Sequence, residues 1–199
     1  MMRIIDCEQG SAEWFNVRMG MPTASMFSTV MAKGKTESKS RNTYLYKLLG
    51  ERITGEPSNS YTNIHMERGH IMEPDARALY ALIKDVEPET VGFICNHNAG
   101  ASPDAFVGND GLLEIKTKLA HLQLEVLMKA ELPPEHHAQV QGQIWIAERE
   151  WCDFISYWPN IKPLILRIYR DDGYINEISG AVDEFNEDLF KMEQKYREI

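Results

Sequence analysis

The sequence predicts an α/β fold of the α+β sandwich type, in which a central mixed sheet is flanked by helices. Apolar residues recur with helical spacing through most of residues 12–84 and again from about residue 175 onward. Between them, several short segments alternate or are rich in β-branched and aromatic residues. The order of helices, strands and a last helix is unlike that of a doubly wound sheet. With 199 residues and no internal repeat, one domain over residues 1–199 is expected.

The first part of the chain is expected to be helical. Ser11 can cap the first helix, Gly20 marks its end, and Gly55 closes the third. Pro74 lies inside the fourth helical pattern, where it lacks an N–H and clashes with the preceding turn, so a kink or restart is expected with Glu73 at the break. The four helices are expected over residues 12–19, 23–32, 42–53 and 63–84.

The second part is expected to combine strands and helices. Strands are predicted over residues 91–95, 112–116, 151–158 and 163–169, and helices over residues 119–129, 135–148 and 175–198. Pro134 suits the start of the helix that follows it, and on this helix Gln139 and Gln143 stand one turn apart beside the buried stripe. The terminal helix is expected to turn inward Ile178, Val182, Phe185, Leu189, Phe190 and Met192.

Composition excludes several classes of protein. The three cysteines lie far apart without a Cys-x-x-Cys pair, so neither a disulfide framework nor a zinc site is expected. A reducing, intracellular setting fits this pattern best. No apolar run is long enough to cross a bilayer and no signal peptide is present, so a cytoplasmic protein without a membrane partner is expected. Phosphate-cradling loops and nucleophilic serine elbows are also missing from the sequence.

The charges are unevenly distributed. A net charge of −9 argues against nucleic acid, because proteins that bind it commonly show a basic patch. Residues 31–52, however, hold six basic and two acidic residues, a local balance of +4. The basic stretch 33–39 within them is interpreted either as a phosphate-binding loop or as a solvated surface loop. An acidic exterior with a basic inner surface is compatible with DNA.

A short hairpin carries the strongest chemical pattern. On the strand 112–116, Glu114 and Lys116 share one face while Ile115 points to the other. The turn Asn109-Asp110-Gly111 folds this strand back beside Asp104, which brings two carboxylates and an ammonium together. Two carboxylates suit Mg²⁺, and a lysine beside them can orient or activate water. The alternative is a turn with solvated charges and a surface salt bridge.

Five motifs in order resemble one known family. They are Trp14-x-x-x-Arg18-x-Gly20-x-x-Thr23-Ala24-Ser25, Gly69-x-x-x-Glu73-Pro74, Ser102-Pro103-Asp104, Glu114-x-Lys116 and Gln139-Val140-Gln141. Together they are similar to the phage lambda exonuclease family, also called YqaJ-type viral recombinases or alkaline exonucleases, of the PD-(D/E)XK nuclease superfamily. The resemblance covers about residues 14–158 and implies a core like that of restriction endonucleases. The sequence departs from the family at Thr117-Lys118 and matches it poorly between Lys116 and Gln139.

The resemblance implies roles for individual residues. Asp104, Glu114 and the backbone carbonyl of Ile115 would hold Mg²⁺, of which two ions are expected, with Mn²⁺ as a possible substitute. Lys116 would activate or position the water, and Glu73 would complete the acidic cluster. The 5′-phosphate would be anchored by Arg18, Ser25, Ser102 and Gln139, and Met66 would be the wedge that splits the terminal base pair.

The resemblance also implies an activity and partners. A single exonuclease domain would digest double-stranded DNA processively from 5′-phosphorylated ends to mononucleotides, leaving a 3′ single strand. A homotrimeric ring around DNA and a single-strand annealing protein as partner are implied as well. Two alternatives stay open: a restriction-like or repair endonuclease on the same fold, and a catalytically inactive DNA-end-binding accessory protein.

Overall fold

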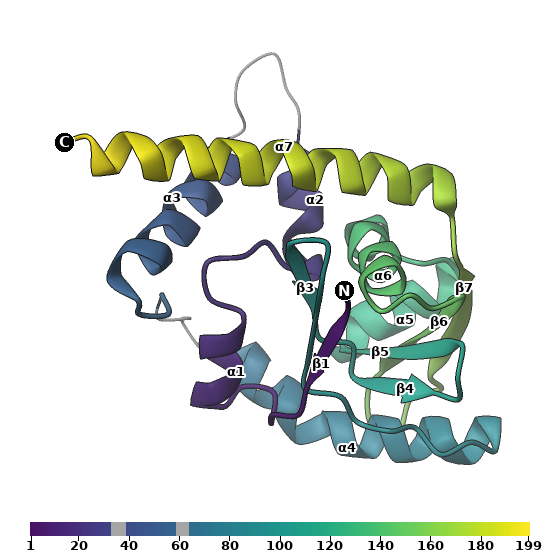
Figure 1. The fold of residues 1–199 in the computed structure, drawn as a ribbon. Coiled ribbons are helices and arrows are strands. Elements are labelled where there is room, and N and C mark those ends of the chain that lie inside the picture. The colour runs from purple at the N-terminus through teal and green to yellow at the C-terminus, as the bar shows by residue number, and fades with distance from the viewer. Residues whose placement is uncertain (33–38, 59–63) are drawn as a thin grey trace.

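The fold of the chain agrees with the predicted α/β class (Figure 1). The computed structural model describes residues 1–32, 39–58 and 64–199, and for residues 64–67 it describes the backbone alone. Its helices are α1 (Ala12–Val17), the 3-10 helix η1 (Ala24–Met26), α2 (Phe27–Val30), α3 (Lys39–Thr54), α4 (Ile64–Lys84), α5 (Ala120–Lys129), α6 (Pro134–Ile146) and α7 (Asp172–Arg197). Its strands are β1 (Arg3–Ile5), β2 (Phe93–Asn96), β3 (Ala99–Ala101), β4 (Ala105–Val107), β5 (Gly111–Thr117), β6 (Trp151–Tyr157) and β7 (Leu164–Tyr169).

The strands form two sheets. The central sheet has the order β4-β5-β6-β7, in which β5 and β6 run parallel and the two outer pairs are antiparallel. This confirms the prediction of a mixed, mainly antiparallel sheet. The expected strand 91–95 instead lies in a second, antiparallel sheet of order β1-β2-β3. β1 and β3 were not predicted, because three residues each are too short to show a strand pattern.

Helices cover both faces of the central sheet (Figure 1). Successive side chains of β5 point alternately to the face covered by α4 and to the face covered by α6 and α7. Leu113 and Ile115 pack in a buried cluster with Ala76 and Tyr80 of α4. Leu112 belongs to the larger core cluster on the face of α6 and α7. The candidate catalytic side chains of β5, Glu114 and Lys116, alternate with Leu113 and Ile115 and therefore lie on the face covered by α6.

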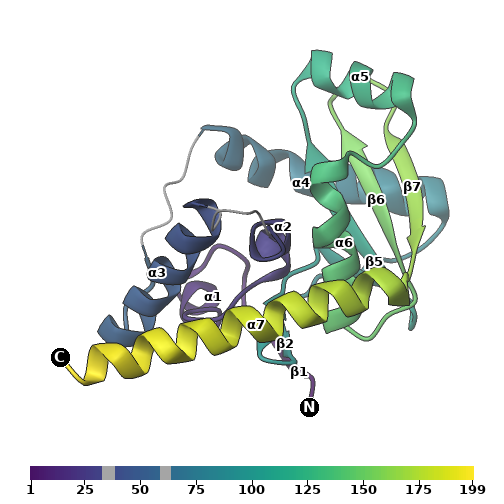
Figure 2. The same cartoon turned by 90° about the horizontal axis from the view of Figure 1, so that it is seen from above.

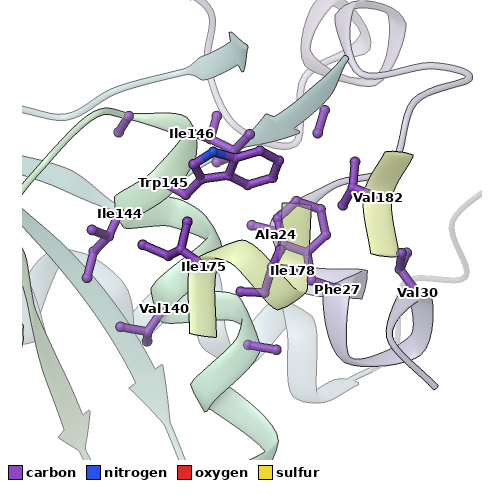
Figure 3. Close-up of a cluster of buried hydrophobic side chains, with 14 of the residues drawn as sticks. Ala24, Phe27, Val30, Val140, Ile144, Trp145, Ile146, Ile175, Ile178 and Val182 are labelled. Carbon is purple, nitrogen blue, oxygen red and sulfur yellow. The ribbon is translucent and has the colours of Figure 1, made fainter. Parts of the chain in front are cut away.

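The main core joins α6 to the segments before and after it (Figure 3). Phe27 of α2 and Trp145 of α6 are in contact, with ring centroids 6.0 Å apart. Gly142 makes this approach possible, because a Cβ there would collide with the Phe27 ring. Each large apolar side chain buried here stabilises the fold by about 1.5–3 kcal/mol. This packing seats η1 and α2 against α6, near the sheet face that carries Glu114.

The terminal helix α7 lies across α2, α3 and α6 (Figure 2). Asp171 caps it by accepting a hydrogen bond from the Tyr174 N–H at 3.0 Å. Four of the six side chains expected to face inward are fully buried, and Met192 is partly so, but Phe190 is 57% exposed. The prediction for Phe190 was wrong because it follows the buried Leu189 directly, and neighbours on a helix point about 100° apart.

The restart that was predicted at Glu73-Pro74 as the alternative to a kink does not occur. α4 is one helix from Ile64 to Lys84 with Pro74 inside it. Pro74 lies on the exposed side, where water can reach the carbonyl that its missing N–H leaves free. Ala76 and Tyr80, both fully buried against the sheet, hold the following turns in place. Of the helices in the described residues, none is long and apolar enough to span a membrane.

Candidate active site

The hairpin predicted from the sequence is present. β4 and β5 are paired in the register Ala105↔Leu113 and Val107↔Gly111, and residues 108–110 join them. Gly108 turns the chain at φ +57°, a conformation that glycine adopts without strain. The Asp104 N–H donates to the Leu113 carbonyl at 3.0 Å, which continues the ladder by one residue. Asp104 is thereby placed beside Glu114.

Glu114 is held by three donors. Its side chain is buried on the α6 side of β5. Gln139 Nε2 donates to Oε1 at 2.7 Å, and Gln143 Nε2 donates to Oε2 at 2.6 Å. Lys116 Nζ forms an ion pair with Oε1 at 2.5 Å. Glu114 and Lys116 therefore share a face, as the alternation of a strand requires. The two glutamines hold the carboxylate from α6.

The charges of the hairpin influence one another. Burial, together with the negative charges of Glu114 and Glu73, raises the pKa of the Asp104 carboxyl well above its usual range. For Lys116, burial acts to lower the pKa, but Glu114 and Asp104 outweigh it and raise the pKa of the amine. Lys116 is therefore an ammonium ion near neutral pH. It can orient water and stabilise negative charge, but it has no lone pair with which to accept a proton.

All four residues predicted to bind the 5′-phosphate line one cavity. Its volume is about 180 Å³, and Asp104, Glu114 and Lys116 line it too. The four residues are Arg18, Ser25, Ser102 and Gln139. They come from α1, η1, the turn before β4, and α6, so only the tertiary fold brings them together. Their proximity to the hairpin is a fact of the structure, while their role in binding phosphate stays a prediction.

Arg18 is oriented by its neighbours. Its guanidinium lies over the Trp14 ring, 3.9 Å from the centroid, and Nη2 donates to Thr23 Oγ1 at 3.1 Å. Trp14 Nε1 in turn donates to Ser102 Oγ at 2.8 Å. Burial lowers the pKa of Arg18, but an arginine stays charged at any physiological pH. The result is a half-buried, permanent cation at the cavity wall.

Glu73 lies apart from Glu114. It forms an ion pair with Arg77 one turn later in α4. With Asp104 it lines a larger cavity of about 840 Å³, and with Ile115 a smaller one of about 180 Å³. Glu73 thus approaches the hairpin from the α4 side of the sheet and Glu114 from the α6 side.

Two sequence predictions fall outside the described parts of the chain. Met66, the expected wedge, belongs to α4, but its side chain is not among those described. Residues 33–38 of the basic stretch are likewise outside the described residues.

The donor set suits a hard cation. Within the described residues, no three His, Cys, Asp or Glu side chains are grouped so as to hold a metal ion. Mg²⁺ does not need such a group, because it binds one or two carboxylates and keeps several waters for substrate phosphates. Asp104 and Glu114 line the same cavity, and their mutual repulsion is what a cation would relieve. These two carboxylates therefore fit Mg²⁺, and the Ile115 carbonyl stays a prediction as a further ligand.

Sequence reasoning missed three residues that shape the site. Gln143 donates a hydrogen bond to Glu114, the Trp14 ring lies under the Arg18 guanidinium, and Thr23 accepts a hydrogen bond from Arg18. A signal existed for the first two, since Gln143 lies four residues after Gln139 and Trp14 four residues before Arg18. Side chains at that spacing share a helix face. Thr23 belongs to the same motif as Arg18, but its contact with Arg18 depends on the turn after α1, which spacing alone does not give.

Comparison with known proteins identifies the family. Residues 13–150, which are 138 of the 199 residues, match the YqaJ-like viral recombinase domain. The chain belongs to this family. The resemblance predicted from the five motifs is thereby confirmed, and the YqaJ-like domain has nearly the predicted limits. Curated protein sequences gave no match.

Solved structures agree with this YqaJ-like assignment. The chain is similar to an alkaline exonuclease, LHK-Exo, from Laribacter hongkongensis, with 34% identity and a TM-score of 0.86 over 94% of this chain and 97% of that one. Its complex with dAMP gives 35% identity and a TM-score of 0.87 over the same shares. A phage-related exonuclease from Haemophilus somnus 129PT, at 14% identity and a TM-score of 0.65 over 89% of this chain and 98% of that one, shares the fold.

Proposed function

We propose that the protein is a Mg²⁺-dependent 5′→3′ exonuclease that acts processively on the 5′-phosphorylated ends of double-stranded DNA. It releases mononucleotides and leaves a 3′ single strand for annealing recombination. One observation supports this proposal above all: the acid pair, the ammonium and the half-buried Arg18 line the same cavity. A cavity of this kind suits a phosphate whose ester bond is to be hydrolysed.

The coarser part of the function follows from the family. A YqaJ-like viral recombinase domain and close likeness to an alkaline exonuclease make this protein a nuclease, and DNA is its substrate. The relative was solved with dAMP, a mononucleotide of the kind an exonuclease releases. The direction of digestion, the metal and the product are the parts that we propose.

In the proposed reaction, the hairpin residues act on the scissile phosphate. Asp104, Glu114 and the Ile115 carbonyl would hold Mg²⁺, which when bound polarises the phosphate and stabilises the leaving 3′-oxygen. Lys116, kept as an ammonium by the two carboxylates, orients the water and offsets charge that develops on the phosphoryl oxygens. Glu73 adds negative charge from the α4 side. Catalysis by this chain is then mainly electrostatic.

The proposed 5′→3′ direction of digestion comes from the phosphate-binding residues that line the same cavity. A guanidinium binds phosphate through two parallel hydrogen bonds, and Arg18 is held by stacking and by Thr23 in a fixed orientation. Ser25 and Ser102 add hydroxyl donors and Gln139 an amide donor. A terminal 5′-phosphate anchored there places the next phosphodiester toward Lys116, so digestion proceeds from the 5′ end.

The proposed assembly rests on the resemblance to the lambda exonuclease family. A homotrimeric ring would enclose the duplex and keep the enzyme on its substrate, and a single-strand annealing protein would bind the product strand. Sedimentation of the purified chain, alone and with duplex DNA, tests the ring separately from the chemistry.

A direct experiment separates the proposal from its alternatives. Linear and covalently closed circular duplexes are incubated with the protein, with Mg²⁺ or with EDTA. An exonuclease degrades the linear DNA only with Mg²⁺ and spares the circle. Cutting of closed circles would support the restriction-like or repair endonuclease instead. End binding without hydrolysis under any of these conditions would support the inactive accessory protein.

A further inference from the structure

Gln143 has an unusual position in the site. It lies on α6, its side chain is 1% exposed, and it lines the cavity that also contains Lys116 and Asp104. Its amide nitrogen donates to Glu114 Oε2 at 2.6 Å. Its amide oxygen is buried as well, yet no described residue donates a hydrogen bond to it.

The orientation of this amide follows from its partner. Glu114 Oε2 is an acceptor, so the group that faces it at 2.6 Å must be the Nε2 donor. Turning the amide over would place two acceptors against each other. The oxygen must therefore point away from Glu114, in a side chain that lines the cavity.

Other buried glutamines of the chain use both ends of their amides. Gln141 donates to the Tyr169 carbonyl at 2.8 Å and accepts from the Asp171 N–H at 3.0 Å. Gln123 donates to the Ser156 carbonyl at 2.9 Å and accepts from the Ser156 hydroxyl. Because leaving a buried acceptor unpaired is unfavourable, the Gln143 oxygen calls for a donor that the described residues do not supply.

The donor to the Gln143 oxygen is best supplied by a water molecule, because hydrolysis requires a water that is oriented in this cavity. Lys116 and Arg18 supply N–H donors to anything bound there, but a water molecule must also place its own protons on acceptors. Both oxygens of Glu114 already accept hydrogen bonds from the chain, and Asp104 Oδ2 accepts from the Ile115 N–H at 2.5 Å. The Gln143 oxygen is an acceptor that carries no charge and takes up no proton.

We propose that Gln143 is a positioning residue that fixes Glu114 through Nε2 and orients a cavity water through Oε1. The inference rests on the proposed function, because it assigns the water to phosphodiester hydrolysis. It gives Gln143 a part different from that of Gln139, whose amide nitrogen donates to Oε1, the other oxygen of the same carboxylate.

The decisive variant is Gln143→Met, which keeps the length of the side chain and removes both polar atoms. Residues that orient a metal-binding carboxylate commonly account for about 10–100-fold in metal affinity or activity. We expect Mn²⁺ affinity without DNA, measured by titration calorimetry or electron paramagnetic resonance, to fall by about that factor. The kcat for linear duplex should fall at least as far, while the KM for DNA ends and the preference for 5′-phosphate stay unchanged.

Gln141→Met is the matched control. It removes two hydrogen bonds from a glutamine of the same helix that is equally buried but faces β7 and the start of α7. It should lower the Tm and leave Mn²⁺ affinity and kcat as in the parent. If Gln143→Met unfolds, Gln143→Ala is used, since the adjoining cavity can admit water in place of the lost atoms.

A crystal structure of the parent gives an independent test, with water expected within about 3.2 Å of Gln143 Oε1. Parental Mn²⁺ affinity and kcat in a folded Gln143 variant, or a Gln143 oxygen bonded to protein, would overturn the inference. Failure of the proposed function would look different: the parent itself would not degrade linear duplex with Mg²⁺. Metal affinity and the position of the water do not depend on that result.

Discussion

Replacing Arg18 with alanine tests the origin of 5′-phosphate selectivity. The guanidinium lies over the Trp14 ring, and Thr23 accepts from one of its five N–H donors, so an unused pair can meet a phosphate. Two charge-assisted hydrogen bonds at about 1.5 kcal/mol each sum to about 3 kcal/mol. Since about 1.4 kcal/mol is a tenfold change, kcat/KM for phosphorylated ends should fall about 100-fold. For 5′-hydroxyl ends it should change much less.

The assay compares two linear duplexes of one sequence that differ only in the 5′ group. The measured quantity is the ratio of their kcat/KM values, in which effects on folding and on general DNA binding cancel. Arg18→Lys keeps the charge but loses the planar fork and the stacking on Trp14, so an intermediate ratio is expected. Arg41→Ala is the control, because Arg41 also lies over an aromatic ring, Phe185, but pairs with Asp188 away from the cavity. An Arg18→Ala enzyme with the parental ratio would refute the reasoning.

Three further predictions concern catalysis, pH and the core. Lys116→Ala should lower kcat by about 100–1000-fold while gel-shift binding of DNA persists, because a charge-stabilising donor is lost; parental turnover in Mg²⁺ would contradict its role. Burial, with Lys116 and Lys118 nearby, lowers the pKa of His136 to about 4. The unfolded chain then binds more protons between pH 4 and 6.5, so the free energy of unfolding should drop by up to about 3 kcal/mol as pH falls through this window. Chemical denaturation should show that His136→Phe removes this drop. Phe185→Ala, at a fully buried ring, should lower the free energy of unfolding by about 3–5 kcal/mol in the same assay, and a loss below about 1 kcal/mol would contradict the assigned core.

Local patterns predicted the hairpin and most of the elements. The alternation of Glu114, Ile115 and Lys116 determines which side chains share a face of β5, and this needs no distant contact. Pro74 shows where local reasoning failed. Its missing N–H and its clash with the preceding turn predicted a kink or a restart, but the burial of Ala76 and Tyr80 against the sheet keeps α4 one helix. Tertiary packing decided the outcome there.

The site was predictable in its composition but not in its internal contacts. The motifs indicated which residues gather, and the structure places Arg18 and Lys116 at one cavity. That Gln143 holds Glu114 depends on the height at which α6 crosses β5. No periodicity in the sequence encodes that height. Contacts between elements distant in sequence were therefore the part that sequence could not supply.

The central claim is that one cavity both selects the 5′-phosphorylated end and cuts beside it. The most direct test uses a linear duplex with a phosphate at one 5′ end and a hydroxyl at the other, each strand labelled differently, with the products sized over time in Mg²⁺. We expect mononucleotides from the phosphorylated strand first and an intact complementary strand. Equal attack at both ends, or oligonucleotides cut from within the duplex, would contradict it.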